Sequence, residues 1–202
     1  GIIESLGGTL GVDFTSNSTL VDVALAATAR VPNGNQLFLI GTLENIGFLT
    51  LDSTGSNTTI QLGSDVVLSA AGEVIGTASP ARIIGSGSTR RLTLNEKQTI
   101  RGSLSLGQNV NLVLTNNGTI VADLPGQTLT IDTVGSASES VNNGTIRADA
   151  GSTVAINAPG LDNGSGIIVA EGGTLHLNGC EIIDGLLATI APGDEVVIPA
   201  PY

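Results

Sequence analysis

A short repeat in the C-terminal half of this chain constrains its fold more than any other feature. Each copy opens with an Asn-Gly or Asn-Asn-Gly step and continues into an alternating strand, so that Ile120, Ile146 and Ile168 align at spacings of 26 and 22 residues. A Gly-containing turn then leads into a second alternating strand, as in Thr128-Leu129-Thr130-Ile131. One unit is therefore strand, turn, strand, turn.

Strict alternation gives each of these strands one apolar face. The apolar face of the first unit carries Ile120, Ala122, Leu129 and Ile131, whereas Thr119, Val121, Thr128 and Thr130 lie on the other face. A period of 20 to 26 residues is too short for a βαβ crossover, but it fits one turn of a β-solenoid, where each strand pairs in parallel with its copy in the next turn. We predict an all-β, right-handed parallel β-helix of about nine rungs, on the order of 40 Å long because paired strands lie about 4.8 Å apart.

Antiparallel hairpins are the main alternative to this solenoid. The Asn-Gly steps at Asn117, Asn143 and Asn163 are typical of two-residue hairpin turns. A meander, however, has no reason to keep equivalent residues at a regular period. In a solenoid, Asn116 would stack on Asn142 and the two amides would satisfy each other's hydrogen bonds inside the turn. The repeat therefore favours the solenoid.

We expect residues 1–202 to form a single solenoid domain with distinctive ends. Residues 1–35 are the candidate N-terminal cap or docking region, and residues 186–202 the C-terminal strand and tail. Within the first region, residues 18–31 also fit the apolar stripe of a short capping helix. The alternation of Val21, Val23 and Leu25 favours a strand instead.

Composition limits the partners of the chain. Seven Lys and Arg against eighteen Asp and Glu give a net charge of −11, which repels phosphate backbones and anionic membrane surfaces. The longest apolar stretch, around residues 21–29, is shorter than the roughly 18 residues that a spanning helix needs. We therefore expect no nucleic-acid partner and no membrane insertion. A single cysteine, Cys180, and the absence of Met suit an extracellular or cell-surface location, with the chain a mature or excised segment.

Several segments resemble the degenerate repeats of large bacterial surface proteins. They are Phe48-Leu49-Thr50-Leu51, Gly85-Ser86-Gly87, Ile100-Arg101-Gly102 and Asn116-Asn117-Gly118-Thr119-Ile120. The nearest families are autotransporter passengers and filamentous-haemagglutinin-like adhesins, and the resemblance, which is compositional, covers most of residues 40–180. It implies a parallel β-helix on an extracellular surface. Those families often carry catalytic or binding inserts in long loops, whereas no expected loop here exceeds about a dozen residues.

One constellation could bind a metal ion. Asp123, Asp149 and Glu171 occupy the same position in successive rungs and would stack about 4.8 Å apart. Such a carboxylate column repels itself, and Ca²⁺, which takes about six to eight oxygen ligands, would relieve the repulsion. The alternative is a set of solvated turn residues, which the lack of an Asp-x-Asp spacing favours. Apart from this candidate calcium column, we expect no cofactor.

The remaining candidate residues argue against an enzyme. A glycosidase needs a defined carboxylate pair, which nothing singles out, and a sugar site favours aromatic platforms, whereas the rings here are Phe14, Phe38, Phe48 and Tyr202. His176 has no second His for a transition-metal site, and Cys180, which follows a Gly at a turn, is better explained as a small packed residue than as a nucleophile. Glycosylation sequons occur at Asn17, Asn57, Asn117, Asn143 and Asn163. Their commoner meaning is turn formation.

We therefore predict a non-enzymatic structural or adhesive rod. Neither end has an obvious polar cap: the candidate self-association residues are Gly1, Ile2, Ile3, Val196, Val197, Ile198 and Tyr202. Open strand edges recruit other strands, so the expected partners are further copies in a head-to-tail fibre or the adjoining rungs of a longer chain. Two alternatives remain open: a β-helix that binds or degrades polysaccharides, with glycans as partners, and a segment of a phage fibre.

Overall fold

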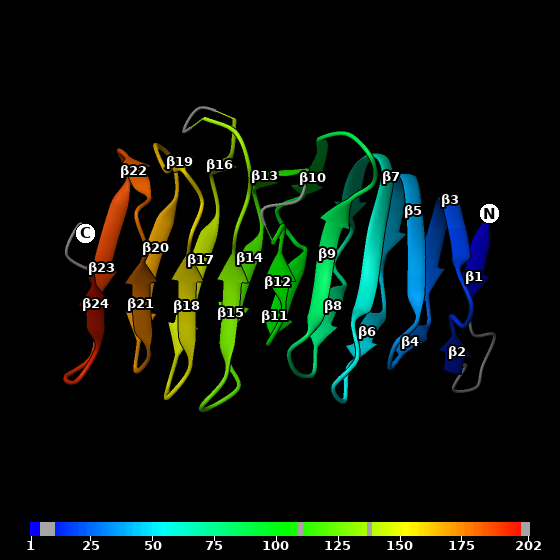
Figure 1. Ribbon diagram of the computed structural model, residues 1–202, viewed down its shortest axis with the longest axis horizontal. Helices are drawn as coiled ribbons and strands as arrows, with labels where there is room; N and C mark the ends of the chain where they lie inside the picture. The colour runs from blue at the N-terminus through cyan, green and yellow to red at the C-terminus, as the bar shows by residue number, and fades with distance from the viewer. Residues whose placement is uncertain (5–10, 109–110, 137–138, 199–202) are drawn as a thin grey trace.

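The computed structural model describes residues 1–4, 11–108, 111–136 and 139–198, and these residues form strands and turns without a helix. Figure 1 shows the strands stacked side by side in one rod, from β1 near the N-terminus to β24 near the C-terminus. All pairings between these strands are parallel. The predicted parallel β-solenoid is confirmed, and the hairpin alternative is wrong. Within the described ranges, no helix is long and apolar enough to cross a membrane.

The nine-stranded sheet forms the first wall of the solenoid. Its strands are β2 (Gly11–Asp13), β4 (Thr28–Pro32), β6 (Phe48–Asp52), β8 (Glu73–Gly76), β11 (Thr99–Gly102), β14 (Thr119–Ala122), β17 (Thr145–Asp149), β20 (Ile167–Glu171) and β23 (Leu186–Thr189). Neighbouring strands of this wall are one turn of the chain apart, so the stack matches the expected number of rungs.

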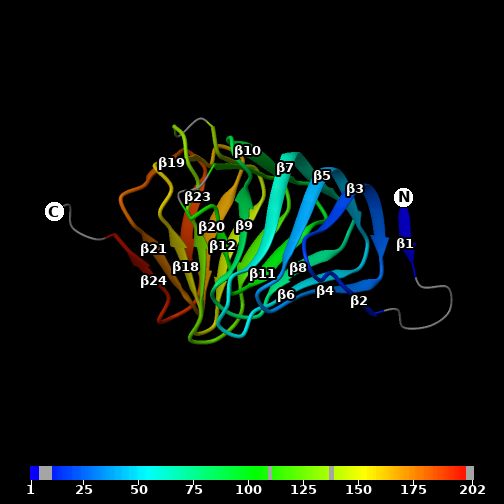
Figure 2. The same cartoon turned by 45° about the vertical axis from the view of Figure 1, so that its right-hand side comes forward.

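The fifteen-stranded sheet supplies two further walls because it forks after β7. Its long strands are β3 (Ser18–Ala26), β5 (Gln36–Asn45) and β7 (Thr58–Ser69). The first halves of these strands begin the second wall, which continues through β9 (Ala81–Gly85), β12 (Ser105–Leu106), β15 (Thr128–Ile131), β18 (Thr153–Ile156), β21 (Thr174–Leu177) and β24 (Glu195–Val197). The second halves of β3, β5 and β7 belong to the third wall. The other strands of this wall are β1 (Ile2–Glu4), β10 (Arg90–Leu94), β13 (Leu112–Asn116), β16 (Val141–Asn142), β19 (Gly160–Asp162) and β22 (Glu181–Ile183). Figure 2 shows the walls wrapped around a common axis.

A bulge bends each of the first long strands from the second wall into the third. In β3 the register shifts between Val21 and Val23, and the intervening Asp22 has φ 48°. In β5 the bend falls at Gly41, with φ 75°, where a Cβ would lie 2.2 Å from Oδ1 of Asp22. That oxygen instead accepts a hydrogen bond of 2.9 Å from the backbone N–H of Thr42. Residues 18–31 thus form strands, β3 and the first part of β4, so the strand assignment is confirmed and the capping helix is wrong.

The apolar face of every rung points into the stack. Ile120 pairs with Ile146 and Ile146 with Ile168, and all three are fully buried. The same holds for Leu129 and Val154 in the second wall. Branched side chains of this size fill a narrow interior in register, which explains why the chain needs so few aromatic residues.

A row of asparagine side chains lines the inside of the corner between the third and first walls. Asn116 Nδ2 donates to Asn142 Oδ1, and Asn142 Nδ2 donates to Asn163 Oδ1, both at 2.7 Å. All three residues are fully buried, so the row satisfies amides that would otherwise destabilise the interior. The predicted stacking of Asn116 on Asn142 is confirmed, and Asn163 extends it. A Cβ on Gly144 would lie 2.1 Å from the carbonyl oxygen of Gly118, which explains the glycine after each asparagine pair.

Candidate functional site

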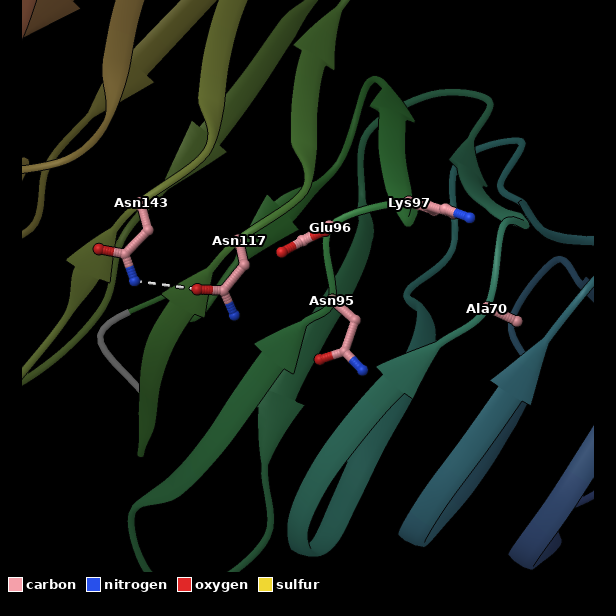
Figure 3. A pocket seen from close by; sticks show the side chains of 6 residues that line it. All are labelled: Ala70, Asn95, Glu96, Lys97, Asn117 and Asn143. Carbon is pink, nitrogen blue, oxygen red and sulfur yellow. Dashed lines mark hydrogen bonds between the residues drawn. The ribbon is translucent and has the colours of Figure 1, made fainter.

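A groove of about 480 Å³ runs along the outside of the same corner (Figure 3). Its lining residues are Ala70, Asn95, Glu96, Lys97, Asn117 and Asn143. Volumes of this order are typical of ligand sites, although such sites are more enclosed and more apolar than this corner.

Local hydrogen bonds fix the turn that forms one side of the groove. The backbone N–H of Gln98 donates to the Asn95 carbonyl at 2.9 Å, which closes the turn. The Gln98 side chain points inward, where its Nε2 donates to the carbonyls of Asn45 at 2.7 Å and Ser69 at 2.6 Å. The buried glutamine thus holds the turn down, and the residues between Asn95 and Gln98 are left exposed.

The groove contains both paired and unpaired polar groups. Asn143 Nδ2 donates to Asn117 Oδ1 at 2.9 Å, and Asn117 Nδ2 donates to the Leu94 carbonyl at 3.0 Å. Glu96 and Lys97 leave the turn in opposite directions in Figure 3, and within the described part of the chain neither makes an ion pair. Lys97 is the only lysine in the sequence. The groove therefore offers an ammonium, a carboxylate and amides to a polar ligand.

The three carboxylates of the predicted column lie on the outer side of the first wall beside arginines. Asp149 pairs in register with Glu171. Arg147 Nε lies 2.5 Å from Asp149 Oδ1 and 3.5 Å from Glu171 Oε2. Asp123 Oδ2 lies 3.0 Å from Arg101 Nη1. Arginine side chains from the same wall thus balance the negative charge of the three carboxylates, whose mutual repulsion a calcium ion would relieve.

The two arginines make this column a ladder of ion pairs along the rod. Arg101 Nε also lies 2.7 Å from Glu73 Oε2. The hydrogen bond to Glu73 is the main cause that raises the pKa of Arg101, and the hydrogen bond to Asp149 does the same for Arg147. Among the described residues, no three His, Cys, Asp or Glu side chains are grouped so that they could hold a metal ion. Calcium binding at the column stays a prediction.

At the N-terminal end of the rod, the inward side chains of the described strands are only partly covered. Ile3 and Val12 point inward and pack against the core but are only partly buried. Ile2 is 70% exposed, and the carbonyl of Gly1 accepts a hydrogen bond of 2.9 Å from Ala24. On the first wall, β2 pairs only with β4, so its outer edge has no partner strand among the described residues.

At the C-terminal end, the inward side chains of the described strands are likewise only partly covered. Ile182 and Val196 pack against the core but are only partly buried, and Leu187 is 40% exposed although it pairs with the fully buried Ile168. Val197 lies in β24 beside His176, and Ile198, just after this strand, is 72% exposed. Tyr202 lies outside the described residues.

The other residues singled out from the sequence lie apart from the groove and the ends, with three exceptions. His176 is half-buried on the outer side of β21. Cys180 is one of the exceptions: it packs against the core near the last rung, and burial raises the pKa of its thiol. Among the sequons, Asn117 and Asn143 line the groove, Asn17 and Asn57 are exposed, and Asn163 is fully buried in the asparagine row. Asn163 therefore serves the turn and is closed to glycosylation in the folded chain.

Sequence reasoning did not find the groove. Its residues belong to turns of several rungs, and only the stacking brings Asn95, Asn117 and Asn143 together. The available signal was Lys97, the sole lysine in the sequence, beside Glu96.

Comparisons with protein-family models, with curated proteins and with solved structures find no match for this chain. Its function is therefore argued from the geometry.

Proposed function

We propose that this chain is a non-enzymatic structural rod that associates end to end with further copies of itself. The partly covered inward side chains of the described strands at both ends are the observation that carries this proposal. Half-buried apolar side chains such as Ile3, Val12, Ile182 and Val196 would gain burial if another rung covered them. Each Å² of apolar surface removed from water contributes about 25 cal/mol, and unpaired strand edges favour the addition of strands.

The side-chain contacts between successive rungs support a structural role. The asparagine row and the arginine ion pairs join successive rungs along the rod. A solenoid gains its stability from contacts between neighbouring repeats, so such ladders stiffen the stack. We further propose an extracellular or cell-surface location, as in the bacterial adhesins that the repeats resemble. The acidic charge and the single cysteine support this location.

The charge distribution determines the conditions in which association should be tested. All seven Lys and Arg residues lie between Arg30 and Arg147, so both ends of the chain carry only acidic charged side chains. Like charges repel at low ionic strength and are screened within about 10 Å at 0.1 M salt. Association should therefore be stronger at high salt.

Size-exclusion chromatography with light scattering tests the proposal. At high salt, we expect masses that are multiples of the 20.2 kDa chain, increasing with concentration. Leu187→Lys places a charge on the open end and should leave single chains. Ile167→Lys is the matched control, because Ile167 is also 40% exposed but lies on the side of the first wall. A wild-type chain that remains a single copy at high concentration would contradict end-to-end association.

The groove favours a second candidate function, the binding of a polysaccharide along the corner. Its amides, carboxylate and ammonium are suited to hydroxyl groups, and its lining residues come from the same corner of successive rungs. A glycan array followed by titration calorimetry tests this candidate. Binding should be lost in the double variant Asn95→Ala/Lys97→Ala and kept in Asn57→Ala, an exposed asparagine outside the groove. A glycan that binds both variants equally would place its site elsewhere.

A further inference from the structure

We infer that the first wall continues across the junction between two copies, with β23 of one copy pairing in parallel with β2 of the next, Leu187 over Val12. This inference rests on the proposed end-to-end association and specifies its geometry. It makes the nine-stranded sheet the element that aligns one rod on another.

The first wall keeps one unbroken pairing register from β2 to β23. A single ladder of inward residues runs through it in register: Val12, Ala29, Leu49, Val74, Ile100, Ile120, Ile146, Ile168 and Leu187. The fifteen-stranded sheet, in contrast, contains register shifts in β3 and β5 and forks after β7. A junction that adds one more step to an existing ladder is therefore best defined in the first wall.

The two ends of this ladder are the members left uncovered. Ile146 and Ile168, in the interior of the ladder, are fully buried. Leu187 is 40% exposed, and Val12 is only partly buried. Stacking Leu187 on Val12 would give each the neighbour that it lacks, and it would pair the free edges of β23 and β2.

The outward residues of the two strands are compatible with this register. With Leu187 over Val12, Leu186 falls over Gly11 and Ala188 over Asp13. No acidic side chain then lies directly opposite another on this wall, although like charges directly opposite would be destabilising. Asp13 is already held by Arg30, whose Nη2 lies 2.7 Å from Asp13 Oδ2, and this ion pair keeps its charge balanced beside the junction.

A cysteine pair tests the register. In a Cys180→Ser background, the double variant Asp13→Cys/Ala188→Cys places two outward thiols opposite each other only if β23 pairs with β2 of another copy. Paired strands lie about 4.8 Å apart, within the Cα separation of about 4.4 to 6.8 Å that a disulfide needs. Within one chain the same residues are eight strand spacings apart, about 38 Å, so every disulfide joins two copies.

On mild oxidation at high salt, we expect a ladder of disulfide-linked multimers on a non-reducing gel. The control Asp13→Cys/Val169→Cys, with its second thiol one rung further in, should give at most a tenth of the linked product. Light scattering on the Cys180→Ser chain separates the outcomes. Multimers without the disulfide ladder, or equal ladders from both pairs, would overturn the register and leave end-to-end association intact. Single chains throughout would overturn both.

Discussion

The middle rungs and the terminal rungs contain the same kinds of inward side chain in very different surroundings. Ile120 and Ile146 have a rung on each side and are fully buried, whereas Leu187, in the same ladder, has a rung on one side and is 40% exposed. In a solenoid each repeat contacts only its neighbours. The burial of an inward side chain is therefore set by its position in the stack. The terminal rungs are the least buried, and they would gain the most buried apolar surface from a further rung.

Truncating one inward residue in each region gives the largest expected difference. Ile146→Ala should lower the free energy of unfolding by about 4 kcal/mol because it opens a cavity between two covered rungs. Leu187→Ala should cost about 1 kcal/mol, since this side chain is already partly in water. Urea unfolding of dilute protein at low salt measures both. Similar losses at the two positions would mean that the last rung is as covered as the middle.

Buried and exposed polar side chains can be compared in the same way at the corner between the third and first walls, where Asn142 lies inside and Asn143 outside. Asn142→Ala should cost about 2 to 3 kcal/mol, because it removes the side-chain acceptor of Asn116 Nδ2 and the donor to the buried Asn163 Oδ1. Asn143→Ala, one residue on and exposed, should change the stability by less than about 0.5 kcal/mol. The same urea experiment compares the two variants. A small cost at Asn142 would contradict a satisfied amide row in the interior.

The ion pairs of the first wall should contribute less than the interior does. Arg147→Ala removes the partner of Asp149 and Glu171, and we expect a loss of about 1 kcal/mol at low salt because these side chains are partly exposed. The loss should shrink at high salt through screening. Unfolding midpoints at two salt concentrations, with Arg147→Lys as the variant that keeps the charge, check this. A midpoint raised by removing Arg147 would contradict the ladder.

The smallest effect should come from the titration of Asp194, whose carboxylate accepts hydrogen bonds in the last turn. Desolvation acts to raise the pKa of Asp194, but hydrogen bonds from the backbone N–H groups of Ala191, Gly172 and Ile190 lower it below its ordinary value. Because the pKa of Asp194 is lower in the folded chain, its hydrogen bonds contribute to the stability of the fold above the ordinary pKa of Asp, about 3.9. This contribution to stability is lost as the pH falls through the folded pKa.

The amide proton shifts of Ile190 and Ala191 provide the measurement. They should move together as the pH falls below about 3.9, and Asp194→Asn should abolish this movement. Asp184→Asn is the control, since Asp184 is also exposed near the last rung. Unchanged amide shifts in the wild type at low pH would contradict the hydrogen bonds from these amides to the Asp194 carboxylate.

The sequence predicts the architecture because the fold repeats in one dimension. Once Ile120, Ile146 and Ile168 are aligned, the register, the inward face and the stacking of Asn116 on Asn142 follow from geometry. The contacts that join distant positions did not follow. Gln98 holds the groove turn through the carbonyl of Asn45, 53 residues away, and no local pattern indicates such a pair.

The bend and the ion pairs were missed for related reasons. The corner in β3 requires a positive φ at Asp22, which only a minority of aspartates adopt. Arg101 donates hydrogen bonds to Asp123 and Glu73 in the adjacent rungs, at sequence separations of 22 and 28. These partners become visible only when the length of every intervening turn is known.

Cryo-electron microscopy of the chain at high salt is the direct test of end-to-end stacking through the first wall. If the ends stack and the first wall runs on, the images will show filaments with a layer spacing of about 4.8 Å and one chain about every 43 Å along the axis. Separate rods of a single chain's length, or rods that meet side by side, would contradict the account.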